Sequence, residues 1–127
     1  MGTFHQQIEI GDFEGNRFEP LDALVDTGAT YTSVPGTVLR RLGVEPEEEV
    51  PFILANGATV RLGMACARIR LDGREQPTLV VFGEPDSSVL LGAFTLEGLR
   101  LGVDSVNKQL IPTPAYLVGL RLDDNRE

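Results

Sequence analysis

The chain has 127 residues, of which 19 are acidic and 11 are basic, for a formal net charge of −8 at pH 7. This length fits one domain, residues 1–127, and excludes a mechanism that needs two lobes within one chain. An acidic surface repels the phosphates of nucleic acids and of anionic lipid head groups. We therefore expect neither a nucleic-acid partner nor a membrane partner.

Cysteine and histidine are scarce in this chain. The single cysteine, Cys66, cannot form an internal disulfide, and the single histidine, His5, leaves no Cys/His set for zinc. We expect no metal and no other cofactor. No apolar run approaches the roughly 18 residues of a membrane span, and the first residues lack the basic and apolar regions of a signal peptide. A cytoplasmic protein is the expectation.

Strand patterns and turn residues alternate along the first third of the chain. Apolar residues of one parity predict a strand at residues 4–10, and residues 21–25 form a second short apolar run. Asp26-Thr27-Gly28 comes directly after it and is predicted to be a loop. The first predicted helix covers residues 37–42.

An Asn-Gly pair lies near the middle of the chain, between apolar-rich runs at residues 50–54 and 59–62. Such a pair is the strongest short signal for a β-hairpin. We expect an exposed hairpin tip at residues 55–58. The strand that leaves the tip is expected to continue to residue 71, just before an Asp-Gly turn.

The remaining predicted elements are short. Strands are predicted at residues 78–82, 89–91, 101–103 and 109–111, with a single helical turn at residues 93–98. Two prolines after residue 111 confine the rest of the chain to a sheet edge or an extended tail, and residues 122–127 are expected to be frayed. Because strands dominate, we predict an all-β fold with one or two short helices.

The segment with the clearest chemical content is Ala23-Leu24-Val25-Asp26-Thr27-Gly28-Ala29. It is apolar up to the carboxylate and small after it, so a rigid strand would deliver Asp26 to a partly buried loop. Thr27 offers a hydroxyl that can orient the loop, and Gly28 permits a close approach that a side chain would prevent. Asp26 is therefore a candidate catalytic group.

This run resembles the active-site signature of aspartic proteases, a hydrophobic pair followed by Asp-Thr-Gly-Ala. Only one copy is present, so the resemblance is to the single-domain, retroviral-type members called retropepsins. The Asn56-Gly57 hairpin stands where these enzymes have the flap that closes over substrate. Val89-Leu90-Leu91-Gly92 resembles their hydrophobic strand beneath the catalytic loop, and residues 93–98 match the short helix after it.

The resemblance implies a closed β-barrel and an aspartic endopeptidase that hydrolyses peptide bonds as a homodimer. Asp26 and its copy from a second chain would form the dyad that activates water. Thr27, Gly28 and Ala29 would support the catalytic loop, with the Thr27 hydroxyls hydrogen-bonded across the two-fold axis.

The resemblance also implies which residues contact a peptide substrate. The flap would present Ala55, Asn56 and Gly57, and the cleft under the catalytic loop would contain Leu90, Leu91 and Gly92. Apolar side chains around the cleft would favour apolar residues near the scissile bond; we expect these to include Leu24, Val34, Ile53 and Leu90.

The sequence also departs from the viral pattern. The hairpin tip is not glycine-rich, and the C-terminus extends past the last strand of the viral enzymes. These departures favour a cellular member of the family, of bacterial or archaeal origin.

Simpler roles compete with these assignments. Asp26 could be a turn aspartate that caps its own loop. Asp104 and Asp86 fit turns better than a second catalytic carboxylate, and His5 fits a solvated position. The whole chain could also be a retropepsin-fold peptide-binding or dimerisation module with little or no proteolysis.

Overall fold

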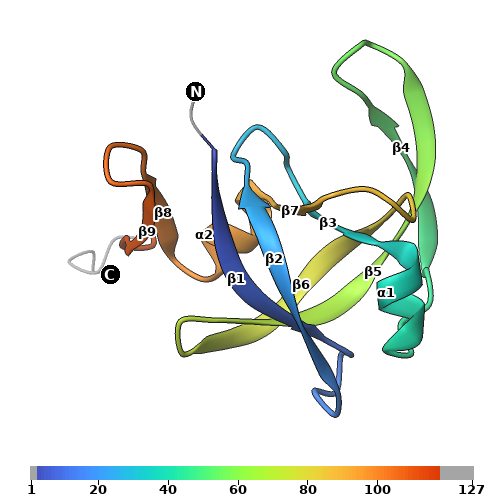
Figure 1. The fold of residues 1–127 in the computed structure, drawn as a ribbon, viewed down its shortest axis with the longest axis horizontal. Coiled ribbons are helices and arrows are strands. Elements are labelled where there is room, and N and C mark those ends of the chain that lie inside the picture. The colour runs from blue at the N-terminus through green and yellow to red at the C-terminus, as the bar shows by residue number, and fades with distance from the viewer. Residues whose placement is uncertain (1–2, 118–127) are drawn as a thin grey trace, which may run out of the picture.

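The computed structural model describes residues 3–117, so the predicted frayed tail at residues 122–127 lies outside the described residues. Within the described part, strands predominate and the two helices are short (Figure 1). The elements are β1 (Phe4–Gly11), β2 (Phe18–Val25), β3 (Thr32–Pro35), α1 (Gly36–Arg41), β4 (Glu48–Ile53), β5 (Thr59–Leu71), β6 (Arg74–Gly83), β7 (Val89–Leu91), α2 (Ala93–Gly98), β8 (Leu101–Asp104) and β9 (Gln109–Pro112).

Six of these strands close into a barrel. The strand order of the main sheet is β1-β2-β7-β3-β6-β5-β4, and an additional antiparallel pairing between β1 and β5 joins Ile10 to Ile69 and closes the ring. Strand β4 lies outside the ring because it pairs only with β5. The predicted all-β fold with a closed barrel is confirmed.

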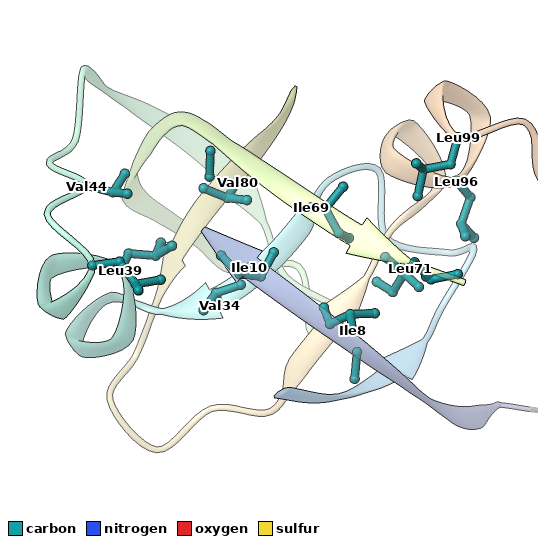
Figure 2. Packing of buried hydrophobic residues seen from close by; sticks show 14 of the residues in the cluster. Ile8, Ile10, Val34, Leu39, Val44, Ile69, Leu71, Val80, Leu96 and Leu99 are labelled. Carbon is teal, nitrogen blue, oxygen red and sulfur yellow. The ribbon is translucent and has the colours of Figure 1, made fainter. Parts of the chain in front are cut away.

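The interior of the barrel is filled by aliphatic side chains from most of its strands and from both helices (Figure 2). Alternation along β5 buries Ala65, Ala67, Ile69 and Leu71, as expected for a strand with one face against a core. In Figure 2, Leu39 of α1 lies at one end of the cluster and Leu96 of α2 at the other. The two helices therefore cover opposite ends of the same core.

Two hairpins extend beyond the barrel on different sides (Figure 1). One is formed by β4 and the first half of β5. The other is the separate two-stranded sheet of β8 and β9, where Leu101 pairs with Pro112 and Asp104 with Gln109.

Strand β3 is not expected from the sequence, because Thr32-Ser33-Val34-Pro35 is too short and too polar to show a periodic pattern. Its strand conformation comes from parallel pairing with β6, which is more than forty residues away in the chain. The other predicted elements are present with boundaries shifted by a few residues; for example, β2 begins at Phe18 and β6 at Arg74.

Candidate active site

Asp26 lies at the end of β2, a strand that is paired on both sides. Strand β2 pairs with β1 along its whole length and with β7 in parallel, where Val25 lies beside Leu91. The Asp26 backbone N–H continues this ladder by donating to the Leu91 carbonyl at 3.0 Å. The carboxylate therefore begins a loop, residues 26–31, whose starting point is fixed by the barrel. We call this segment the Asp26 loop.

The first turn of the Asp26 loop is held by hydrogen bonds to Asp26 itself. The Gly28 N–H donates to Asp26 Oδ1 at 2.9 Å, and the Ala29 N–H donates to the Asp26 carbonyl at 3.1 Å. A Cβ at position 28 would lie 3.1 Å from Asp26 Oδ1, closer than most side-chain contacts allow. Gly28 thus leaves room for the carboxylate in this orientation, while Thr27 is exposed in the protomer.

The segment between β7 and α2 supports the far side of this loop. The Ala93 N–H donates to the Ala29 carbonyl at 2.9 Å, and the Phe94 N–H donates to the Thr30 carbonyl at 2.8 Å. Beside these bonds, a Cβ on Gly92 would lie only 2.5 Å from the Tyr31 backbone. The close approach of the two segments therefore requires glycine at position 92.

A cavity of about 730 Å³ opens beside Asp26. The carboxylate of Asp26 is the only acidic group that lines it within residues 3–117. The rest of the lining is mainly apolar and comes from β4, the hairpin turn, β6 and β7, and it includes Phe52, Ile53, Val81 and Leu90. A second hollow in the described part of the chain, near the β5–β6 turn and of about 440 Å³, is instead lined by charged Glu9, Arg70 and Glu75.

The β4–β5 hairpin ends in a three-residue turn, Ala55-Asn56-Gly57. The Leu54 N–H donates to the Ala58 carbonyl at 2.8 Å, the Gly57 N–H donates to the Leu54 carbonyl at 2.9 Å, and Asn56 Oδ1 accepts from the Ala58 N–H at 2.9 Å. Gly57 has φ of +86°, the left-handed conformation that such turns place at a glycine. Ala55 lines the cavity, whereas Asn56 and Gly57 are exposed outside its lining.

Three aromatic rings connect the hairpin to the Asp26 loop. Tyr31 contacts Phe52 of β4 edge-to-face, with ring centroids 6.4 Å apart, and contacts Phe94 of α2 at 5.7 Å. Sequence reasoning missed this cluster, because no local pattern relates three aromatic residues so far apart in the chain.

The structure separates the residues expected around the cleft. Leu90 and Ile53 line the cavity, but Val34 does not: it is completely buried in the barrel core (Figure 2). The reason is the alternation of β3, which turns Ser33 toward the cavity and Val34 inward.

Leu24, which was also expected around the cleft, is absent from the cavity lining. Of the segment beneath the loop, Leu91 is a core residue and Gly92 is buried.

The competing polar residues lie in turns and on the surface. Asp104 ends β8 and accepts hydrogen bonds from the backbone N–H groups of Val106 and Asn107, both at 3.1 Å, so the predicted strand-end turn is confirmed. His5 is exposed, and its Nδ1 lies 2.7 Å from Asp22 Oδ2.

Within residues 3–117 there is no cluster of three or more potential metal-binding side chains. No helix in the same part of the chain is long and apolar enough to cross a membrane.

Comparisons with known proteins agree with the fold. Residues 6–98 match the family described as gag-polyprotein putative aspartyl protease. The simian foamy virus (mac) protease is similar at 23% identity, with 76% of this chain and 94% of that chain covered and a TM-score of 0.54. The EIAV protease in complex with the inhibitor HBY-793 is similar at 22% identity, with 77% and 88% covered and a TM-score of 0.56. No curated protein matches the chain.

Proposed function

Because this chain belongs to the family of gag-polyprotein putative aspartyl proteases, we propose that it is an aspartic endopeptidase that acts as a homodimer. One observation carries the proposal: a single carboxylate, Asp26, is held by a hydrogen-bonded loop at the wall of a mainly apolar cavity. The whole chain would form one protease domain, and its cellular origin is part of the same proposal.

The need for a second chain is a consequence of the chemistry. A single carboxylate cannot take a proton from water and at the same time donate one to the substrate carbonyl. Two carboxylates held about 3 Å apart share one proton, because both cannot be ionised together at that distance. A two-fold axis beside the Asp26 loop would supply the second carboxylate from an identical chain. Thr27 is exposed in the protomer and would then face its own copy across the axis.

The proposed reaction needs only this pair of carboxylates and water. The ionised carboxylate takes a proton from the water as the water oxygen attacks the scissile carbonyl carbon. At the same time the protonated carboxylate donates its proton to the carbonyl oxygen. In the resulting tetrahedral intermediate, the carboxyl that took the water proton passes it to the nitrogen and the C–N bond breaks. The other carboxylate takes back a proton from a hydroxyl of the intermediate, and a carboxylic acid and an amine leave. No bond forms between enzyme and substrate.

The substrate would be an extended peptide that lies between the Asp26 pair and the β4–β5 hairpin. Phe52, Ile53 and Leu90 line the cavity, so apolar side chains next to the scissile bond would be preferred. The hairpin would act as the flap, because Ile53 is 81% exposed in the protomer and is available to cover a bound peptide. Backbone hydrogen bonds to the peptide would add to these side-chain contacts.

The test is cleavage of a peptide library by the wild-type chain and by two variants. Asp26→Asn keeps the size of the side chain and removes the charge, so cleavage should be lost while the dimer mass is unchanged. Asp104→Asn makes the same change in a distant turn and should cleave like the wild type. Cleavage that persists in Asp26→Asn would refute the dyad.

A wild-type chain that forms the dimer and binds peptides, but cleaves none of them at any pH, would favour the peptide-binding module over the protease. Measuring the dimer mass and peptide binding alongside cleavage therefore separates the two functions.

A further inference from the structure

Three threonine hydroxyls form a buried chain of hydrogen bonds close to the Asp26 loop. Thr32 belongs to β3, Thr78 to β6 and Thr95 to α2. The Oγ1 atoms of Thr32 and Thr95 are 2.6 Å apart, and those of Thr95 and Thr78 are 2.7 Å apart. All three residues are at most 5% exposed, and within residues 3–117 they are the only buried polar or charged residues.

Thr95 is the necessary middle member of this chain. Each hydroxyl has one proton to donate, so Thr95 can donate to only one neighbour and must accept from the other, unless both neighbours donate to it. In every arrangement, removal of the Thr95 hydroxyl leaves both Thr32 and Thr78 without this partner at buried positions. Buried polar groups left in that way are costly.

The chain of hydroxyls ends at the backbone that supports the Asp26 loop. Thr32 Oγ1 accepts a hydrogen bond from the Gly92 N–H at 3.1 Å. Gly92 lies between Leu91, whose carbonyl accepts from the Asp26 N–H, and Ala93, whose N–H donates to the Ala29 carbonyl. The position of Gly92 therefore determines the position of both ends of the turn that carries the carboxylate.

We propose that Thr95, acting through Thr32 and the Gly92 N–H, is a positioning residue that holds the Asp26 loop in register with β7. The catalytic part of this inference rests on the proposed function; the mechanical part does not. A valine at position 95 would have nearly the same shape and would fill the core equally well. The advantage of a hydroxyl at this position is therefore the connection that it makes. It joins Thr78 of β6 to Thr32, which bonds the Gly92 N–H beside the Asp26 loop.

The test compares Thr95→Val, which keeps the shape and removes the hydroxyl, with Thr95→Ser, which keeps the hydroxyl. The control is Val44→Ala, which opens a core cavity at the end of the barrel away from α2 (Figure 2). Amide hydrogen exchange is measured on the full chain at Asp26, Gly92 and Ala93, together with kcat and KM for a cleaved peptide.

We expect Thr95→Val to accelerate exchange at Asp26 and Gly92 by about tenfold beyond the average change of the other barrel amides, as expected for locally opened bonds. It should lower kcat by about tenfold or more and leave KM within about twofold, because a small displacement of a reacting group affects mainly the chemical step. Thr95→Ser should restore both. Val44→Ala should change all barrel amides alike.

Uniform acceleration in Thr95→Val, indistinguishable from Val44→Ala and without a selective loss of kcat, would overturn the inference. If the wild type cleaves no peptide but the exchange pattern is as expected, the proposed function fails and the mechanical role of Thr95 stands. If Thr95→Val does not fold, Thr78→Val serves in its place, because it removes the outer end of the same chain and should give a smaller selective effect of the same kind.

Discussion

The Asp26 loop and the β4–β5 hairpin border the same cavity but are held in opposite ways. The loop connects β2 and β3, which both pair with β7, and its residues Asp26, Ala29 and Thr30 are hydrogen-bonded to the segment from β7 to α2. The loop packs so closely on that segment that Gly92 has no room for a side chain. The hairpin lies outside the ring and carries the exposed side chains of Ile53 and Leu54. From this difference we expect the Asp26 carboxylate to keep a fixed position, and the β4–β5 hairpin, which would cover a peptide, to move more easily.

The largest expected effect comes from adding one methyl group to each region. In Gly92→Ala the new Cβ would lie 2.5 Å from the Tyr31 backbone, whereas at Gly57 no atom lies within 4 Å and only the positive φ opposes a side chain. We expect Gly92→Ala to lower the free energy of unfolding by about 3 kcal/mol and Gly57→Ala by about 1 kcal/mol. Urea unfolding at a fixed chain concentration measures both. Equal losses would contradict the contrast between the two regions.

The contact that joins the regions gives the next effect. Phe52→Leu and Tyr31→Leu each remove the edge-to-face pair, and a double-mutant cycle should give a coupling of about 1 kcal/mol in the free energy of unfolding. A second cycle with Phe94→Leu and Phe52→Leu is the matched control. Phe94 contacts Tyr31, but no ring contact joins Phe94 to Phe52. A coupling near zero for Tyr31 and Phe52 would show that the hairpin is not held at this point.

Local sequence patterns predict the Asp26 loop much better than its surroundings. Asp26-Thr27-Gly28-Ala29 is a contiguous motif after an apolar run, so its loop conformation at a strand end can be read directly. The closing pair between β1 and β5 depends on residues about sixty positions apart, and no local pattern encodes it. The Tyr31–Phe52 contact and the threonine chain have the same origin in the tertiary fold.

The wrong prediction for Val34 has a different cause. The residue is apolar and lies soon after the motif, which favours a place in the cleft as long as β3 is not recognised as a strand. Without that strand, the alternation that sends Ser33 to the cavity and Val34 to the core cannot be applied. Because the four-residue strand β3 was not predicted, the Val34 side chain was expected in the cleft, whereas it points into the barrel core.

A smaller change is expected in the pH dependence of the proposed activity. Ala29 borders the cavity, and a serine there would add a hydroxyl that can donate to the ionised form of the proposed carboxylate pair. Because such a hydrogen bond favours the ionised form, Ala29→Ser should move the acid limb of the pH–rate profile downward by about one pH unit. The kcat/KM of both proteins is measured over the same pH range. A profile that is unchanged or moves upward would contradict the role given to position 29.

The smallest effect is expected far from both regions, in the β8–β9 turn. The Asn107 side-chain amide, and then backbone N–H groups, donate to Asp104 and hold the pKa of its carboxyl below the ordinary value. Because the folded-state pKa is the lower one, the carboxylate stabilises the fold above the unfolded-state pKa, near 4, and this contribution is lost as the pH falls through the folded value.

Asp104→Asn should therefore lower the thermal unfolding midpoint slightly at neutral pH, and the difference from the wild type should vanish in acid. A difference that persists in acid would mean that Asp104 acts through the shape of the turn and not through its charge. In either case the proposed activity should be unchanged, because β8 and β9 form a sheet separate from the barrel. Loss of the proposed activity in this variant would show that the β8–β9 hairpin is coupled to the Asp26 loop.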